Sequence, residues 1–248
     1  KQKTAYEIST RDWSSDVCSS DLAEDLKPNR LEAAKDVAAE FINGRPNDNI
    51  GITLFAGETF TQCPLTVDHA VLLDMIHNIK CGLIEDGTAV GMGVANAVTR
   101  LKDSKAKSKV IILLTDGTNN KGDISPLTAA EIAKSFGIRV YTIGVGTNGM
   151  APYPYPVGNT VQYINMPVEI DEKTLTQIAG TTDGNYFRAT SNSKLKEVYE
   201  EIDKLEKTKL NVKEYSKREE DYRWFALAAF LCVLLEVLLR NSILKKIP

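Results

Sequence analysis

Oxygen-bearing side chains occur in three separate stretches of the chain. Asp116-Gly117 follow directly on an apolar run, Asp86-Gly87-Thr88 place a hydroxyl just ahead of a small-residue helix, and Asp16 to Ser20 precede a long helix. Carboxylate and hydroxyl oxygens are the ligands of a hard divalent cation, which keeps waters that a partner can replace. Taken singly, Asp116-Gly117 is typical of a turn and Thr88 of a helix N-cap, so the prediction depends on the three stretches together.

Strand and helix patterns alternate along the chain, as in proteins built from βαβ units. Lys109–Thr115 is a nearly continuous apolar run, which is typical of a strand buried on both faces. The other predicted strands are Ile50–Ala56, Thr59–Gln62, Arg139–Gly144 and Asn185–Arg188. The predicted helices are Asn29–Gly44, His69–Ile79, Thr88–Leu101, Leu127–Phe136, Thr174–Ala179 and Lys194–Leu205. We therefore predict an α/β fold with a doubly wound, mostly parallel sheet, which binds ligands at the carboxyl ends of its strands.

The composition excludes several classes of protein. Across 248 residues, 30 lysines and arginines stand against 33 aspartates and glutamates, so no basic excess indicates nucleic-acid binding. Four cysteines without paired spacing argue against a disulfide scaffold and against a cysteine zinc site. The two histidines, His69 and His77, lie outside the loops that carry the oxygen ligands, so no Ser-His-Asp catalytic set is predicted.

The carboxyl-terminal part of the chain has the pattern of a membrane anchor. Trp224–Leu239 carries one charge, Glu236, and extension through Leu244 reaches the roughly 20 residues that a membrane span needs. We predict a transmembrane helix over residues 222–244, after a charged stalk over 206–221 and before a tail over 245–248. A buried amphipathic helix that closes the domain is the alternative. Lysines and arginines flank both ends, so charge does not determine which side of the membrane the domain faces.

Several stretches carry a resemblance to a known family. They are LAEDLKPNRLEAAK (Leu22–Lys35), FAGETFTQCPLT (Phe55–Thr66), DGTAVGMG (Asp86–Gly93), LLTDGTNNKGDISP (Leu113–Pro126), MPVEID (Met166–Asp171) and IDKLEKTK (Ile202–Lys209). In these stretches the chain resembles the von Willebrand factor A (VWA) domain, and more specifically the membrane-anchored BatA-type proteins of bacterial aerotolerance operons. The resemblance runs from Leu22 to Pro248 and places the domain at residues 22–205.

The resemblance implies a metal-ion-dependent adhesion site (MIDAS), which combines a DxSxS motif with a distant Thr and a distant Asp. Thr88 and Asp116 occupy the family's Thr and second Asp positions. Counting back from Leu22 puts Asp16 at the motif's Asp and Ser20 at its second Ser. These four residues would hold Mg²⁺, with Mn²⁺ or Ca²⁺ as alternatives, and a partner protein's carboxylate would bind the ion.

The resemblance also implies a setting and a class of partner. The function would be metal-dependent protein binding without catalysis, in a cell-envelope complex with related aerotolerance proteins and an AAA+ ATPase. The protein would lie in the bacterial inner (cytoplasmic) membrane, with the VWA domain on the periplasmic side.

The first 21 residues depart from the family's pattern. The family expects an apolar central strand that ends in DISGS, whereas Glu7–Ser20 reads EISTRDWSSDVCSS, with Cys18 at the first Ser position. A thiol is a poor ligand for Mg²⁺, so we expect metal binding by the chain as written to be weak or absent. Residues 12–22 resemble a translated sequencing adapter, and we hypothesise that they are an in-frame artefact. A genuine site that has lost metal binding is the alternative.

Two neighbouring segments between residues 144 and 168 are rich in glycine or proline. Gly144–Gly149 matches the GxGxxG pattern, but the prolines that follow cannot open a helix for a dinucleotide. Met150–Val168 is predicted to be a long loop that either contacts a partner or packs on itself.

The alternative functions are a metal-free scaffold and a metal-dependent phosphoryl-transfer or hydrolytic enzyme. Such an enzyme would use Asp16 or Asp116, with Lys121 as the basic residue nearest to Asp116 in the sequence.

Overall fold

One six-stranded sheet organises the described part of the chain. The computed structural model describes residues 10–16, 19–81, 85–147, 149–157 and 160–216, together with residues 229 and 233. The strands follow the order β3-β2-β1-β4-β5-β8 across the sheet. Their bounds are β1 Thr10–Asp16, β2 Asn49–Phe55, β3 Thr59–Thr66, β4 Lys109–Thr115, β5 Arg139–Val145 and β8 Tyr186–Ala189. All of them belong to the first of two compact units, which ends at Leu205.

All neighbouring strands of the sheet run parallel except β3, which runs antiparallel to β2. From β1 the chain moves first to β2 on one side and later to β4 on the other, so the strand order reverses between β1 and β4. In open α/β sheets such a reversal leaves a crevice beyond the carboxyl ends of the strands. Asp16 ends β1 and Asp116 directly follows β4, so two of the predicted ligand positions flank this reversal.

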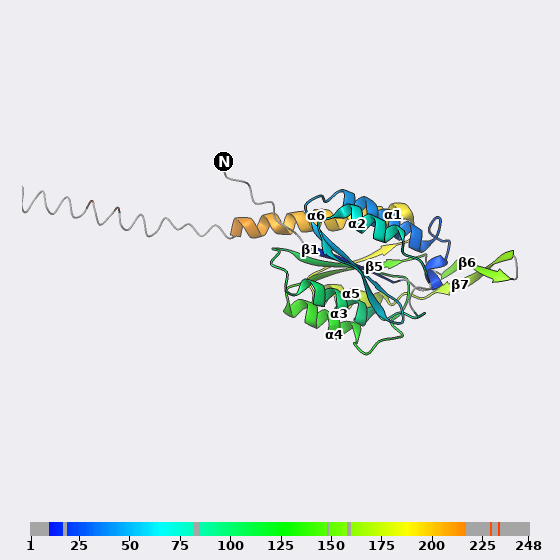
Figure 1. The fold of residues 1–248 in the computed structure, drawn as a ribbon. Helices are drawn as coiled ribbons and strands as arrows, with labels where there is room; N and C mark the ends of the chain where they lie inside the picture. Colours follow the sequence, from blue (N-terminus) through cyan, green and yellow to red (C-terminus); the bar gives the residue numbers. More distant parts are fainter. Residues whose placement is uncertain are drawn as a thin grey trace, which may run out of the picture. The chain divides into compact units, whose positions relative to one another are not determined.

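Helices cover both faces of the sheet, which confirms the predicted α/β fold class (Figure 1). One face carries α1 (Arg30–Asn43), α2 (His69–His77) and the first part of α6 (Asn192–Ser216). The other face carries α3 (Val90–Leu101), α4 (Pro126–Ser135) and α5 (Glu172–Thr181). The first compact unit therefore folds as three layers, with the sheet in the middle.

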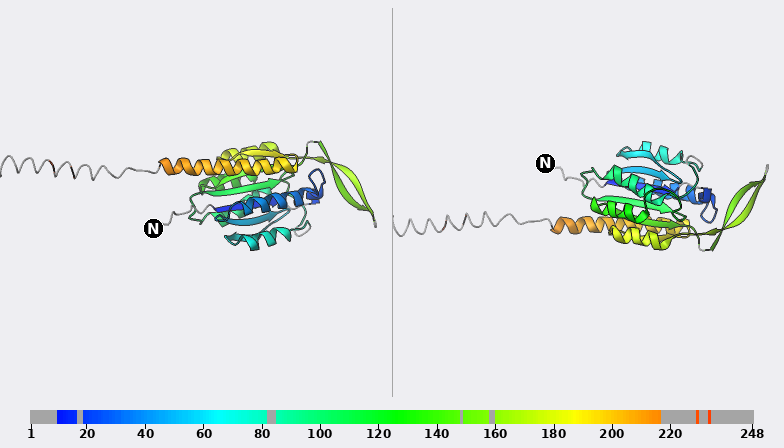
Figure 2. Two further views of the ribbon diagram at one scale, coloured as in Figure 1. Left: turned by 90° about the horizontal axis from the view of Figure 1, so that it is seen from above. Right: turned by 90° about the horizontal axis from the view of Figure 1, so that it is seen from below.

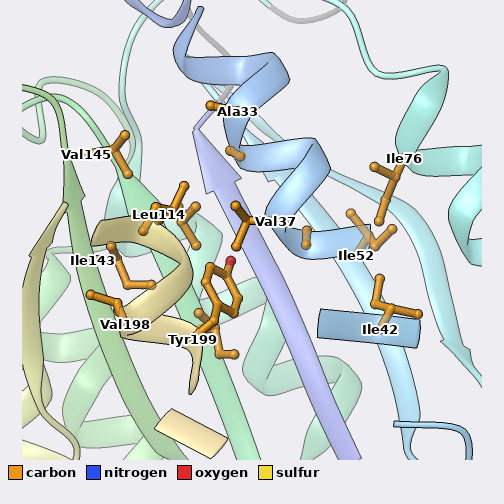
Figure 3. Close-up of a cluster of buried hydrophobic side chains, with 14 of the residues drawn as sticks. Ala33, Val37, Ile42, Ile52, Ile76, Leu114, Ile143, Val145, Val198 and Tyr199 are labelled. Atoms are coloured by element: carbon orange, nitrogen blue, oxygen red, sulfur yellow. The ribbon is translucent and has the colours of Figure 1, made fainter. Parts of the chain in front are cut away.

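Two apolar clusters fill the space between the sheet and its helices. Figure 3 shows the first, in which Val37 of α1 and Tyr199 of α6 pack with Leu114 of β4. The second cluster joins α3, α4 and α5 to the opposite face of the sheet. Within it, a Cβ on Gly93 of α3 would lie only 2.7 Å from Phe55 Cδ1, so this helix packs closely because its residues are small.

The polar amino-terminal segment occupies the centre of the sheet. The backbone of Thr10–Asp16 forms β1, with Trp13 opposite Ile52 of β2 and Ile112 of β4. We expected an aberrant segment over residues 1–21 in place of the first strand. A strand nevertheless runs there, because the hydrogen bonds of a β-ladder join main-chain groups whatever side chains they carry. The adapter origin of residues 12–22 concerns the gene and stays a hypothesis.

Residues 149–157 and 160–168 pair as a β-hairpin, so the prediction of a long loop was wrong. β6 (Gly149–Val157) pairs antiparallel with β7 (Thr160–Val168) in a separate two-stranded sheet. The hairpin extends away from the main sheet, as both views in Figure 2 show. Prolines at alternate positions of β6 favour a loop, but they are equally compatible with an edge strand, whose outward positions need no N–H donor.

Among the described residues, no helix combines the length and the apolar character that crossing a membrane requires. The predicted transmembrane helix over residues 222–244 and the tail over 245–248 lie outside the described residues, apart from residues 229 and 233. The membrane anchor therefore stays a prediction.

Candidate functional site

Main-chain hydrogen bonds hold three loops together at the carboxyl ends of the strands. Ala89 N donates to Ala56 O, in the loop after β2, at 2.7 Å. Asn120, in the loop after β4, accepts from Thr88 N through its Oδ1 at 2.9 Å and donates from its own backbone to Thr88 O at 3.0 Å. The loop that carries Thr88 is therefore fixed between the loops that follow β2 and β4.

Thr88 and Asp116 lie at the same groove. A Cβ placed on Gly117 would be 3.2 Å from Thr88 Oγ1, so the hydroxyl lies against the backbone next to Asp116. Thr88 and Asp116 are each only 4% exposed, and both line a groove of about 600 Å³. The structure thus brings together two of the four predicted site residues from loops that are distant in the chain.

The Thr88 hydroxyl makes no hydrogen bond within the part of the chain that the structure describes, and its oxygen is not fully buried, so it is open to the groove. A hydroxyl oxygen that is open to a groove is available as a ligand for an ion bound there. Among the described residues, no three His, Cys, Asp or Glu side chains gather as metal ligands. A site here would therefore combine hydroxyl and carboxylate oxygens.

The other two predicted ligands are placed by their backbone only. Asp16 is the last residue of β1, and Ser20 lies in the short 3₁₀ helix η1 (Ser19–Leu22). Their side chains lie outside the described part of the structure, as does Cys18 altogether. The assignment of Asp16, Ser20, Thr88 and Asp116 as metal ligands stays a prediction.

A buried arginine, Arg30, joins Asp116 to a second carboxylate. Arg30 Nη1 donates to Asp116 Oδ2 at 2.8 Å, while Arg30 Nε and Nη2 donate to the two carboxylate oxygens of Asp25, each at 2.8 Å. The side chains of all three residues are at most 3% exposed. Asp25 also accepts from Thr147 N, in the loop after β5, at 2.7 Å. This network ties the start of α1 to the loops after β4 and β5.

The network holds Asp25 and Arg30 in their ionised forms. Burial by itself would raise the pKa of Asp25, but hydrogen bonds from Arg30 and from the Thr147 backbone outweigh burial and hold the pKa at about 2. Burial would likewise lower the pKa of Arg30, but its partners Asp25 and Asp116 raise that pKa above its ordinary value. The positive charge of the Arg30 guanidinium therefore offsets part of the negative charge of Asp116.

Our sequence analysis missed Arg30, although the chain carries a signal for it. Arg30 is the first residue of α1, after Asn29, which caps the helix by accepting from Glu32 N at 2.8 Å. A cation is unfavourable at a helix N-terminus, so an arginine there indicates carboxylates nearby. Gly146 provides the space, because its φ is +130° and a Cβ there would lie 2.8 Å from Arg30 Nη2. The glycine pattern after β5 thus accommodates a guanidinium, not a dinucleotide.

The fold and this groove define the class of protein. The von Willebrand factor type A domain matches residues 16–201, a stretch that begins at Asp16 and contains Thr88 and Asp116. The chain therefore belongs to the von Willebrand factor type A domain family, which confirms the resemblance seen in its sequence.

Proteins similar to this chain include solved bacterial structures. The chain is 32% identical to the conserved hypothetical protein BatB from Bacteroides thetaiotaomicron, with a TM-score of 0.71 over 80% of this chain and 99% of that chain. It is 29% identical to an aerotolerance-related membrane protein from Bacteroides fragilis, with a TM-score of 0.69 over 79% of this chain and 97% of that chain. A UPF0353 protein of Mycolicibacterium paratuberculosis is 31% identical over 200 residues, which are 74% of this chain and 56% of that relative. The chain spans 56% to 64% of the length of curated relatives that it matches.

Proposed function

We propose that this domain binds partner proteins through a divalent cation held at the groove of Thr88 and Asp116. The observation that carries the proposal is the Thr88 hydroxyl, which lies at the groove beside the Asp116 loop and makes no hydrogen bond in the described part of the chain. Membership of the VWA family supports a role in protein interaction. A glutamate or aspartate of the partner would complete the coordination of the ion.

The donors at the groove fit a hard cation. Thr88 offers a hydroxyl and Asp116 a carboxylate, which are oxygen ligands of the kind that Mg²⁺, Mn²⁺ and Ca²⁺ take. Asp16, at the end of β1, and Ser20, in η1, are the remaining proposed ligands. We propose Mg²⁺ as the ion, which when bound supplies a positive centre for an external carboxylate.

Arg30 favours this use of the cation. It donates to Oδ2 of Asp116, so this carboxylate contributes less negative charge to a metal ion than an unpaired one would. An ion with little anionic charge from the protein keeps more of its own charge and attracts an anion from outside. At 3% exposed, the Arg30 side chain is itself too buried to bind that anion directly.

We also propose a membrane setting for the domain. The predicted helix over residues 222–244 would anchor the chain in the bacterial inner membrane, with the VWA domain on the periplasmic side. The similarity to an aerotolerance-related membrane protein from Bacteroides fragilis supports this setting. Related aerotolerance proteins and an AAA+ ATPase are the proposed partners in a cell-envelope complex.

One observation weighs against phosphoryl transfer at the same groove. Lys121, the basic residue that this alternative would use, pairs with Glu85 at 3.1 Å, and its side chain is 46% exposed. A lysine that positions a phosphoryl group would face the nucleophilic carboxylate instead of a surface glutamate. We therefore retain protein binding as the proposed function.

Metal titration of the full chain in lipid nanodiscs tests the proposal, on a Cys18→Ser background that restores the expected hydroxyl. Calorimetry should show Mg²⁺ and Mn²⁺ binding that Thr88→Ala and Asp116→Asn each weaken by about tenfold or more. Thr99→Ala is the matched control, because Thr99 lies on the exposed side of α3 and its hydroxyl donates to Ala95 O. Equal metal affinity in Thr88→Ala and in its parent would contradict the proposal and favour a metal-free scaffold.

A further inference from the structure

The β6–β7 hairpin has one edge that is closed to further strands. Prolines occupy every second position of β6 from Pro152 to Pro156, and a proline has no N–H to donate. Pro152 O accepts from Glu24 N at 2.9 Å, so the backbone at this position faces away from β7. The outer edge of β6 therefore lacks donors at its prolines and is already contacted by the segment before α1.

The outer edge of β7 is open. The register places Asn165, Tyr163 and Val161 directly opposite Pro152, Pro154 and Pro156. In an antiparallel pair, two directly opposite residues either both direct their N–H and C=O groups toward the other strand or both direct them away from it. Asn165, Tyr163 and Val161 therefore direct their N–H and C=O groups outward. Within the described residues β7 has no strand beside it other than β6, and its outward N–H groups from Val161 to Asn165 are a template for another strand. The template ends before Pro167, which takes the next outward position and has no N–H.

One face of the hairpin is apolar over the part that lines a pocket of about 290 Å³. The residues that share this face and line the pocket are Ala151, Tyr153, Tyr155, Ile164, Met166 and Val168. Ala23 and Arg30 also line it, and the whole stretch 149–168 carries no charged side chain. The pocket therefore suits uncharged, apolar side chains of a ligand.

The pocket adjoins the groove of Thr88 and Asp116. Arg30, Pro167 and Val168 line both of them. Because β7 ends at Val168, a strand laid along its outer edge would run from the pocket toward the groove. A carboxylate near that end of the added strand would then meet the proposed cation.

We infer that the partner binds as an extended strand added to the outer edge of β7. Main-chain groups of Val161, Tyr163 and Asn165 pair with the partner strand, and its apolar side chains at alternate positions enter the pocket. An aspartate or glutamate at the end nearest Val168 binds the cation. This last contact rests on the proposed function, whereas the strand pairing and the pocket rest on the geometry of the hairpin.

A library of random octapeptides, displayed on phage and presented to the full Cys18→Ser chain in nanodiscs with Mg²⁺, tests the inference. We expect enriched peptides to alternate apolar residues and to carry an acidic residue at one end. Val161→Pro/Asn165→Pro removes two outward N–H groups without removing a bond to β6, so it should weaken binding of these peptides by about tenfold. Val161→Ala/Asn165→Ala keeps both N–H groups and should stay within about threefold of the parent.

A second measurement does not depend on any variant. Backbone hydrogen exchange of the parent chain should slow at Val161, Tyr163 and Asn165 when an enriched peptide is bound. Unchanged exchange at these amides, or no enriched peptides at all, would overturn the inference. So would light scattering that shows a dimeric parent and a monomeric proline variant, because a second copy of the chain would then occupy the edge.

The variants also separate this inference from the proposed function. Binding that Thr88→Ala and chelation abolish but the proline variant leaves intact would overturn strand addition and leave the metal proposal standing. Binding that the proline variant abolishes but chelation leaves intact would support strand addition and contradict the metal contact.

Discussion

Arg30 Nη1 lies 2.8 Å from Asp116 Oδ2, although 86 positions separate the two residues in the chain. The contact joins the first residue of α1 to the loop after β4, and Asp25 holds the other side of the same guanidinium. Because all three side chains are buried, the network influences both the stability of the domain and the charge that a metal ion at the groove would experience.

Arg30→Met should destabilise the domain by about 3–5 kcal/mol, because it leaves two buried carboxylates without their cation. Denaturant unfolding of the full chain in nanodiscs, followed by near-ultraviolet circular dichroism, measures the change. Lys27→Met is the control, since the Lys27 side chain is 75% exposed and its pair with Glu24 is worth less than about 1 kcal/mol. Similar losses in the two variants would show that the buried network contributes little.

Asp25 should make the domain's stability depend on pH in the acid range. Its folded pKa of about 2 lies below its ordinary value of 3.8, so its contribution is complete above pH 4 and is lost as the pH falls toward 2. The contribution amounts to about 2 kcal/mol. Asp25→Asn should therefore flatten the fall of the melting temperature between pH 4 and pH 2. Asp103→Asn, at an exposed position after α3, is the control, and a slope in Asp25→Asn that matches the parent would refute this role.

Gly146→Ala should destabilise the domain through Arg30. The new Cβ would lie 2.8 Å from Arg30 Nη2, at a residue whose φ is +130°. Gly149→Ala is the matched control, because Gly149 has a φ of +101° and no heavy atom lies within 4 Å of the Cβ position. We expect Gly146→Ala to cost about 1–3 kcal/mol more than Gly149→Ala in denaturant unfolding. The excess should shrink on an Arg30→Met background, and an excess that persists there would place its cause elsewhere.

Cys18→Ser should strengthen Mg²⁺ binding by about tenfold or more, because it exchanges a soft thiol for a hard hydroxyl at the first Ser position of the motif. Calorimetry on the full chain measures the affinity. Cys232→Ser removes a thiol from the predicted anchor and should change nothing. If Cys18→Ser and the unmodified chain bind the ion equally, residue 18 is not a ligand.

The gene itself offers a further check. If residues 12–22 derive from an adapter, their codons spell the adapter sequence, and an independent reading of the gene supplies an apolar strand that ends in a DISGS-type motif. Codons 12–22 that do not match an adapter would end this hypothesis, and the polar strand β1 would then be genuine.

Local patterns along the chain were sufficient to predict most of the fold. Lys109–Thr115 forms β4 with the predicted bounds, because an unbroken apolar run is stable as a strand only when both of its faces are covered. The meeting of Thr88 and Asp116 was also predictable, since parallel strands bring their following loops to one edge of the sheet. Apolar periodicity and the alternation of strands with helices can be predicted from the order of residue types along the chain, because they do not depend on contacts with distant segments.

Tertiary contacts decided what these patterns left open. Nothing near Arg30 in the sequence specifies Asp116 as its partner, because the pairing depends on how the loop after β4 is placed over the start of α1. The hairpin likewise depends on its surroundings. The Pro152 to Pro156 pattern suits both a loop and an edge strand, and the contact from Glu24 N to Pro152 O is made only when residues 128 positions apart meet. The ion pair of Arg30 with Asp116 and the contact of Glu24 with the edge of β6 both join segments that are distant in the chain. The folded structure therefore determines them, and the local residue pattern does not.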